Sequence, residues 1–182
     1  MGGFIIKKMK TTTLVLCAFF AALSAILSQI FIPVGLVPIG LVHISVFLAA
    51  GLLGAKYGAV SQIVYVFLGL AGAPVFTGFR GGPGVLAGPT GGFIAGYIGC
   101  AFVTGLIIDR FGYSIKALIP AMYVGWVVTY SMGLPWFMYV TNLSLIASLP
   151  VCVFPFLPGD LVKTILCAVL VNRLRISVRL TA

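Results

Sequence analysis

The stretch GAPVFTGFRGGPGVLAGPTGGFIAGY, residues 72–97, joins two apolar segments, carries one charge, Arg80, and is too rich in glycine for a regular helix. Its glycines allow backbone angles that other residues avoid, and they let another group approach the main chain closely. Its prolines, Pro74, Pro83 and Pro89, remove backbone donors and fix local turns. The stretch therefore predicts an ordered, irregular loop that closes a small binding site at one face of a membrane.

The composition of the whole chain indicates a membrane protein. Of its 182 residues, 62% are hydrophobic and 7% are charged, whereas about 25% of the residues in a soluble domain are charged. Because so few charges cannot cover a globular surface, most of the surface must face lipid. A single domain over residues 1–182 is the simplest organisation for this length.

Apolar segments separated by glycine, proline and charge predict an all-α integral membrane protein with six transmembrane helices. The first segment has about 20 residues, enough to span a bilayer, and Gly54 breaks a later run into two short halves. A second connector is predicted between the fifth and sixth helices, at residues 133–158, with a short interfacial helix at 142–153. The glycine-rich loop lies between the third and fourth helices. The six predicted helices cover residues 11–32, 40–53, 57–70, 92–108, 117–132 and 160–171.

The basic residues fall almost entirely on one side of this arrangement. Six helices place both termini on the same side, and cytoplasmic segments of membrane proteins carry an excess of Lys and Arg. Arg80 lies on the other side, and Lys163 lies within the sixth helix. Both termini are therefore predicted to be cytoplasmic, with the glycine-rich loop outside. The side of the termini receives Lys7, Lys8, Lys10, Lys56, Arg110, Lys116, Arg173, Arg175 and Arg179.

The sequence lacks the residues that several classes of function require. The net charge of +9 is not arranged in a stripe with interleaved aromatic residues, so nucleic-acid binding is not expected. The sequence has no GxxxxGK[ST] motif with which to bind ATP, and no HExxH or GxSxG motif. The four cysteines are far apart and predict neither a metal site nor a disulfide framework. We expect no cofactor, no metal and no enzymatic activity.

Asp160 and Lys163 are the residues best suited to recognise a ligand. They lie three apart, on one face of a helix. Asp160 falls in the first turn, where the helix dipole favours an anion. Lys163 gains nothing there, and a charge at the centre of a membrane helix costs about 2.5–3.5 kcal/mol on insertion scales. Either the lysine simply pairs with Asp160 or reaches outward, or the pair faces a polar cavity and binds a small ligand.

Other residues on the outer side are candidates for the wall of such a cavity. Arg80 lies between glycines and could pair with a carboxylate, or it is a solvated loop arginine. His43 begins the second helix, where the expected role is a polar wall residue. Aromatic residues that could supply apolar walls, or simply pack between helices, are Phe93, Tyr97, Trp126 and Tyr130.

Five short motifs together resemble one known family. They are GLAGAPVF (69–76), GG (81–82), LAGPTGGF (86–93), PGDLVK (158–163) and AFFAA (18–22). With the six-helix topology, they resemble the biotin-specific S components, the BioY family, which are substrate-binding subunits of energy-coupling-factor (ECF) vitamin transporters. The resemblance covers essentially the whole chain.

The resemblance implies a site that captures biotin at the outer face of a prokaryotic plasma membrane. Asp160 and Lys163 match the family's binding pair, whose carboxylate and ammonium complement the N–H donors and the carbonyl of a ureido ring. Arg80, His43 and Phe93 stand where family members show other residues, such as asparagine, glutamine and tyrosine. The implied binding residues are Asp160, Lys163, Arg80, His43, Phe93, Tyr97, Gly91 and Thr90.

The resemblance also implies partners. S components work with a transmembrane coupling subunit, the T component, and with two ATPase subunits that drive uptake. Ala18 and Ala22 match the family's AxxxA motif and would contact the coupling subunit. Small residues four apart on a membrane helix allow another helix to approach closely.

Three alternatives differ in what they require. A stand-alone secondary transporter would need ionisable residues along a pathway through the bilayer, whereas Asp160 and Lys163 lie at one end and no internal repeat is evident. A small membrane enzyme would have only Asp109 and Asp160 as acidic groups, on opposite faces of the membrane. An S component for another small vitamin would differ in the details of the cavity wall.

Overall fold

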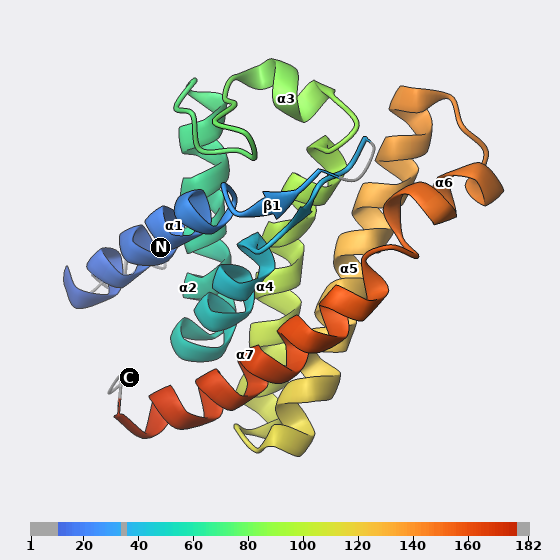
Figure 1. Cartoon of the computed structure of the whole chain (residues 1–182). Coiled ribbons are helices and arrows are strands. Elements are labelled where there is room, and N and C mark those ends of the chain that lie inside the picture. Colours follow the sequence, from blue (N-terminus) through green and yellow to red (C-terminus); the bar gives the residue numbers. More distant parts are fainter. Residues whose placement is uncertain (1–10, 34–35, 178–182) are drawn as a thin grey trace, which may run out of the picture.

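Apolar helices form nearly all of the molecule (Figure 1). The computed structural model describes residues 11–33 and 36–177, so Lys7, Lys8, Lys10 and Arg179 of the predicted charge pattern lie outside the described residues. In chain order the elements are α1 (Thr11–Leu27), β1 (Phe31–Ile32), β2 (Ile39–Gly40), α2 (Val42–Leu70), α3 (Pro83–Ala87), α4 (Gly91–Phe111), α5 (Ile115–Thr141), α6 (Leu145–Cys152) and α7 (Leu157–Ser177).

The helices α2, α4 and α5 are long and apolar enough to cross a membrane. The pair α6 and α7, bent by 51° between them, passes the same test when the two helices are taken together. The helix α1 is apolar but shorter, with 17 residues. The protein is therefore an all-α membrane protein.

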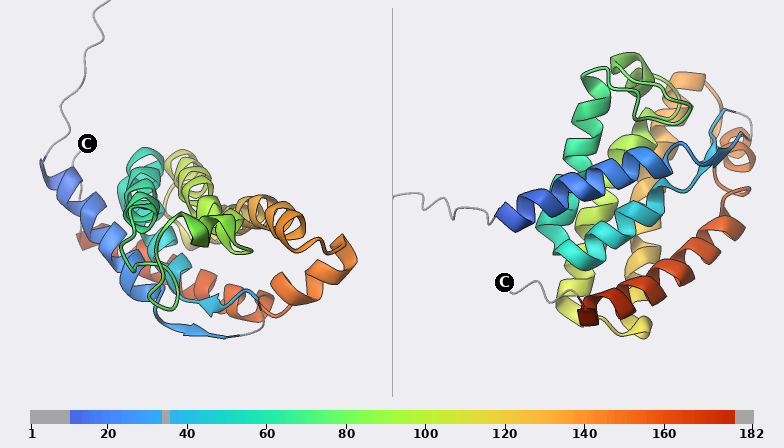
Figure 2. Two further views of the ribbon diagram at one scale, coloured as in Figure 1. Left: turned by 90° about the horizontal axis from the view of Figure 1, so that it is seen from above. Right: turned by 60° about the vertical axis from the view of Figure 1, so that its left-hand side comes forward.

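The helix α2 is broken at Gly54, as the sequence predicts. Gly54 has φ 77° and ψ −178°, a conformation that glycine adopts without a steric penalty. The chain then turns back. Gly58 lies so close to the first part of the helix that an added Cβ atom would be 3.0 Å from the Cα atom of Ala50. The element thus consists of two legs packed against each other, and Figure 2 shows them from two further sides.

The middle of the bundle is packed through small residues. The helix α4 lies between α2 and α5 and makes its most extensive contacts with both. At Gly105 the backbones are so close that an added Cβ atom would lie 2.5 Å from the Cα atom of Ala55. Small residues of this kind let membrane helices approach each other and gain dispersion contacts.

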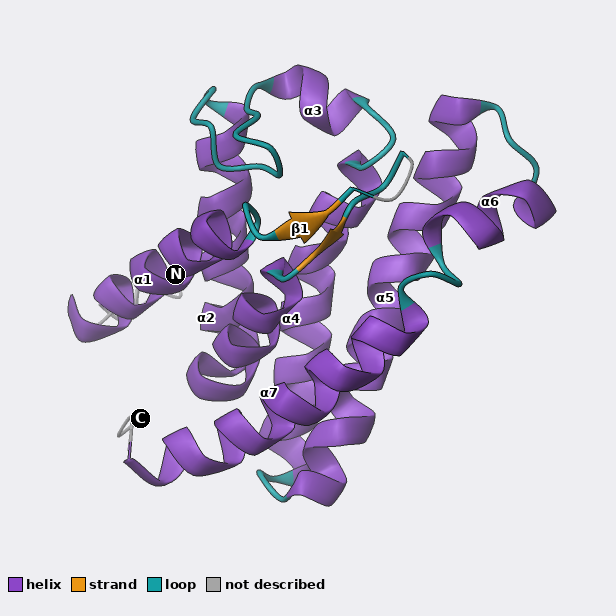
Figure 3. Ribbon diagram, in the orientation of Figure 1, coloured by secondary structure: helices purple, strands orange, loops and turns teal. Residues whose placement is uncertain are grey.

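The sequence-based boundary of the first helix is wrong. The helix was expected to continue to residue 32, but α1 ends at Leu27. Residues 31–32 instead pair with residues 39–40 in a short antiparallel hairpin, drawn in orange in Figure 3. The hairpin lies against the end of the bundle that also carries α3.

The connector predicted at residues 133–158 is wrong at both of its ends, over residues 133–141 and 157–158. The helix α5 continues through Gly133 and Pro135 to Thr141, and α7 begins at Leu157. Gly133 allows close packing, since a Cβ atom there would lie 2.2 Å from the ring of Phe93. Proline is tolerated in membrane helices because neighbouring groups satisfy the freed backbone carbonyl. The short helix predicted within 142–153 is confirmed as α6.

The glycine-rich stretch is an ordered loop with a short helix, α3, inside it. Residues 71–82 form turns, in which Phe76 and Arg80 exchange two backbone hydrogen bonds of 2.9 and 3.2 Å. Gly91 and the residues that follow belong to α4. The loop, α3, the β-hairpin and the connection from α5 to α6 lie at one end of the bundle (Figures 1 and 2).

Candidate ligand-binding site

A cavity lies at this end of the bundle, between the loops and the helices. It holds about 680 Å³ of space between its atoms, part of which is open solvent at its mouth. Its wall is built from the β-hairpin, the glycine-rich loop and the helices α2, α4, α5, α6 and α7. The predicted binding residues that line it are His43, Arg80, Thr90, Phe93, Tyr97, Asp160 and Lys163.

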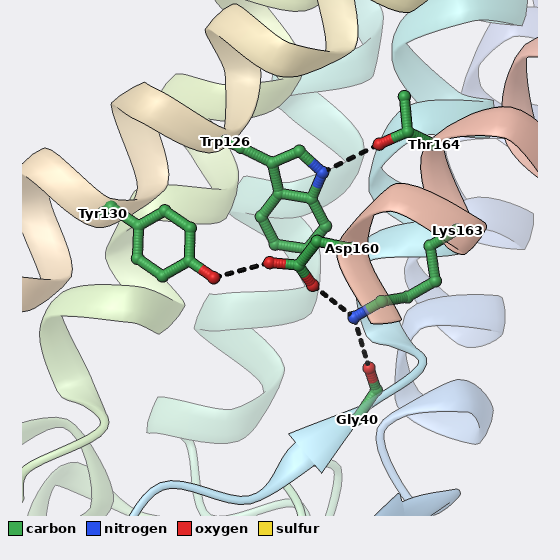
Figure 4. A network of polar contacts seen from close by, with 6 residues as sticks. All are labelled: Gly40, Trp126, Tyr130, Asp160, Lys163 and Thr164. Carbon is green, nitrogen blue, oxygen red and sulfur yellow. Dashed lines mark hydrogen bonds and ion pairs between the residues drawn. The ribbon is translucent and has the colours of Figure 1, made fainter. Parts of the chain in front are cut away.

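Asp160 and Lys163 form a buried ion pair in the wall of this cavity (Figure 4). The Oδ1 atom of Asp160 lies 2.8 Å from Nζ of Lys163, and the two residues are 3% and 6% exposed. Tyr130 on α5 donates a hydrogen bond of 2.5 Å to Oδ2 of Asp160. Lys163 also donates to the carbonyl oxygen of Gly40, at 3.4 Å. A buried charge is tolerated when it is paired and hydrogen-bonded. Here the two charges pair with each other, and each accepts or donates a further hydrogen bond, Asp160 with α5 and Lys163 with β2.

Trp126 on α5 joins the polar pair to the rest of the wall. Its Nε1 atom donates a hydrogen bond of 3.0 Å to Oγ1 of Thr164 on α7, as Figure 4 shows. The ammonium of Lys163 lies 4.9 Å from the centre of the Trp126 ring, within the range of a cation–π interaction. The ring of Tyr130 is stacked against Trp126, with centroids 6.0 Å apart.

His43 brings an unsatisfied polar atom to the cavity. The side chain lies in the first turn of α2, is buried, and packs between aromatic rings, 4.0 Å from Trp126 and 4.8 Å from Tyr97 between centroids. Its Nε2 atom has no hydrogen-bond partner among residues 11–33 and 36–177. Because an unpaired buried polar atom costs free energy, a ligand that hydrogen-bonds to Nε2 would gain that free energy on binding.

Arg80 also lines the cavity and is exposed. Its Nε atom donates a hydrogen bond of 3.0 Å to the carbonyl oxygen of Thr77, which also lines the cavity. The cavity wall therefore combines a buried ion pair with an exposed guanidinium. This combination suits a ligand that carries a polar group and an anionic group.

The start of α4 contributes three of the predicted residues in different ways. Thr90 lines the cavity just before the helix, and Phe93 lines it one turn later, edge-on to the ring of Tyr130 at 6.3 Å. Gly91 is not in the wall. A Cβ atom there would lie 1.8 Å from the carbonyl oxygen of Leu86, so Gly91 allows α3 to pack against the end of α4.

Sequence reasoning missed several residues of the wall. Pro38 and Gly40 lie in or beside the β-hairpin, Phe76 in the glycine-rich loop, and Phe156 just before α7. Phe76 belongs to a quoted motif and could have been included on that signal. No local pattern marks the hairpin residues, because their place depends on how the hairpin packs across the helices.

The predicted partner-binding residues do not line this cavity. Ala18 and Ala22 are exposed on α1 and lie four residues apart, on one face of the helix. Within the described ranges, no three His, Cys, Asp or Glu side chains lie together as metal ligands would. The four cysteines are all buried and unpaired with one another.

Comparisons with known proteins agree on one family. The model of the BioY family matches residues 5–180. A "Biotin transporter BioY" from Thermotoga maritima is 36% identical over 165 residues, covering 89% of this chain and 95% of that protein. A second, from Rhodobacter capsulatus, is 38% identical over 164 residues, covering 82% and 86% of the two chains.

A solved structure has the same fold. It is described as the S-component for biotin from an ECF-type ABC transporter, and it superimposes with a TM-score of 0.83 at 33% sequence identity. The match covers 92% of this chain and 95% of the solved one. The cavity therefore lies in a fold already seen in a substrate-binding membrane subunit, and the chain belongs to the BioY family.

Proposed function

We propose that this chain is the membrane subunit that binds biotin for ATP-driven uptake by an ECF-type transporter, and that biotin binds in the cavity described above. The observation that carries the proposal is the buried Asp160–Lys163 pair in the wall of this cavity. The similarity to biotin transporters and to a biotin S-component supports the same ligand. The protein acts by binding and transport, not as an enzyme.

The chemistry of the wall complements the two ends of biotin. The ureido ring offers two N–H donors and a carbonyl acceptor, which suit the carboxylate of Asp160 and the ammonium of Lys163. The carboxylate of the valerate tail suits the exposed guanidinium of Arg80. His43 offers Nε2 as a further polar contact. Thr90, Phe93 and Tyr97 complete the proposed contact set, and Gly91 supports it by packing against α3.

We assign six membrane spans to a single domain over residues 1–182. They are α1, the two legs of α2, α4, α5 and α7. Arg80 lies at the cavity end, whereas Arg110 ends α4 and Lys116 begins α5 at the other end. The excess of positive charge favours the cytoplasm for that other end and for both termini. The cavity then opens toward the outside of the cell.

The proposed partners are a transmembrane coupling subunit and two ATPase subunits. The sequence itself has no ATP-binding motif, so the energy for uptake must come from other chains. The exposed face of α1 with Ala18 and Ala22 is the proposed contact with the coupling subunit, because small residues allow close helix packing.

Calorimetry on the purified chain in detergent tests the proposed ligand. We expect binding of biotin, weaker binding of desthiobiotin, and none of an unrelated vitamin such as thiamine. A folded chain that does not bind biotin would refute the ligand assignment.

Ala18→Trp and Ala22→Trp test the proposed partner face. Each variant should keep its biotin affinity, because the face lies away from the cavity, and should fail to copurify with the coupling subunit and the ATPases. Phe19→Trp is a matched control on the neighbouring exposed surface of α1. Normal assembly of both alanine variants would show that another surface meets the coupling subunit.

A further inference from the structure

Gln29 ties the end of α1 to the glycine-rich loop. The residue lies just beyond Leu27, the last residue of α1. Its Oε1 atom accepts a hydrogen bond of 2.9 Å from the backbone N–H of Phe79. Its Nε2 atom lies 3.2 Å from the carbonyl oxygens of both Val75 and Phe76. One side chain therefore bonds to both strands of the turn that spans residues 75–80.

The backbone at the tip of this turn is one that needs support. Phe79 has φ 55°, in the left-handed region where a residue other than glycine is strained. Its ring is 72% exposed, so burial of the side chain contributes little to holding that conformation. The hydrogen bond from the N–H of Phe79 to Gln29 satisfies the strained residue's donor and stabilises the turn.

The same turn carries part of the cavity wall. Phe76, Thr77 and Arg80 line the cavity, and Arg80 is exposed. Ser28, the residue after α1, adds a second bond, because its hydroxyl donates to the carbonyl oxygen of Val75 at 2.5 Å. The position of the turn in the cavity wall thus depends on polar side chains just beyond the end of α1.

We propose that Gln29 is a positioning residue, whose side-chain amide holds the Phe76–Arg80 turn over the mouth of the cavity and slows the release of the ligand. The identity of that ligand rests on the proposed function. The holding of the turn does not, since it follows from hydrogen bonds between residues of the protein itself.

Hydrogen exchange of the ligand-free protein tests whether Gln29 holds the turn. Gln29→Ala should exchange backbone hydrogens in residues 76–80 about tenfold faster than the wild type, because the bonds that protect the turn are lost. Exchange in α4 should stay the same. Ser131→Ala, which loses a hydroxyl bonded within its own helix, is the control for a general loss of stability. Unchanged exchange in residues 76–80 of Gln29→Ala would overturn the proposal.

The dissociation rate of radiolabelled biotin tests the effect on release. Gln29→Ala should release biotin about tenfold faster, with a much smaller change in the association rate. Gln29→Glu keeps the size of the side chain but places an oxygen beside two carbonyl oxygens, so it should also release biotin faster. A role in filling space alone would leave Gln29→Glu like the wild type, and that result would overturn the proposal.

The two measurements separate this inference from the proposed function. If the wild type does not bind biotin, the ligand assignment fails, and the exchange rates still decide whether Gln29 holds the turn. If the wild type binds biotin and the turn loosens in Gln29→Ala without faster release, then the turn does not control the cavity mouth and the proposal is wrong.

Discussion

The sequence contains two acidic residues, Asp109 and Asp160, and the structure uses them in opposite ways. Asp160 faces the cavity and is held by side chains, the ammonium of Lys163 and the hydroxyl of Tyr130. Asp109, at the end of α4, accepts a hydrogen bond of 3.0 Å from the backbone N–H of Ala55. That N–H belongs to the first residue after the break in α2, where unpaired donors of a new helical segment favour a carboxylate.

The surroundings of Asp109 join three helices at the break. The hydroxyl of Tyr113 donates to Oδ1 of Asp109 at 3.1 Å. From α7, Asn172 donates to the carbonyl oxygen of Tyr113 at 2.8 Å, and the guanidinium of Arg175 lies over the ring of Tyr113, 3.0 Å from its centre. Arg175 also donates to the carbonyl oxygen of Gly51, at 3.4 Å.

The comparison teaches how to separate a structural carboxylate from one that can serve a ligand. A backbone N–H at a helix break loses stabilising free energy when its acceptor is removed, so the contact of Asp109 with Ala55 serves the fold. Side chains at a cavity wall can exchange their partners for those of a ligand, so Asp160 remains open to binding. Three sets of substitutions, in order of decreasing expected effect, test this distinction.

Lys163→Ala should produce the largest effect, on affinity. We expect biotin binding to weaken at least a hundredfold, about 2.8 kcal/mol, because the variant removes the buried cation of the cavity wall. Calorimetry measures the affinity. The double variant Asp160→Asn with Lys163→Ala, which leaves no unpaired buried charge, controls for unfolding and should also fail to bind. Wild-type affinity in a folded Lys163→Ala protein would contradict the assignment of the site.

Asp109→Ala should affect stability instead of affinity. Loss of the contact to the N–H of Ala55 should lower the free energy of unfolding by about 1–2 kcal/mol, as for other helix N-terminal caps. Biotin affinity should change by less than about tenfold, a difference of about 1.4 kcal/mol. Thermal unfolding in detergent checks the first value and calorimetry the second. Asp109→Asn keeps an oxygen for the N–H and should lose less stability; a loss of binding comparable to that of Lys163→Ala would remove the contrast.

Tyr130→Phe and Tyr113→Phe form the most closely matched pair and should have the smallest effects. Each deletes one hydroxyl that faces an aspartate, and a hydrogen bond contributes about 1 kcal/mol to stability or binding. Tyr130→Phe should weaken biotin binding several-fold, whereas Tyr113→Phe should lower only the free energy of unfolding. The same calorimetric and thermal measurements apply. Identical behaviour of the two variants would show that the two aspartates do not differ in role.

The sequence predicts the membrane class, the break at Gly54 and the polar pair for clear reasons. Few charges exclude a soluble surface, and glycine tolerates a positive φ. Lys163 stands out because a charge within an apolar membrane helix is costly unless it is paired or binds a ligand. The sequence does not predict that α5 passes through Gly133 and Pro135, since both residues usually end helices. In the protein, packing of Phe93 against Gly133 overrides that local preference.

The composition of the candidate site could be predicted only in part. Asp160, Lys163 and Arg80 stand out because they are charges in an apolar chain. Phe156 and the hairpin residues do not stand out, because they reach the cavity through contacts between segments distant in sequence. The role of Asp109 was missed for the same reason: its partner Ala55 is 54 residues away along the chain.

The break at Gly54 also has a consequence for the surrounding lipid. At 1.5 Å per residue, the two legs of α2 are about 18 and 24 Å long, less than the hydrocarbon thickness of about 30 Å in a typical bilayer. In the proposed six-span topology each leg is a span, and the mismatch is relieved when the bilayer becomes locally thinner. That topology therefore predicts that short-chain phospholipids favour the folded state over long-chain ones.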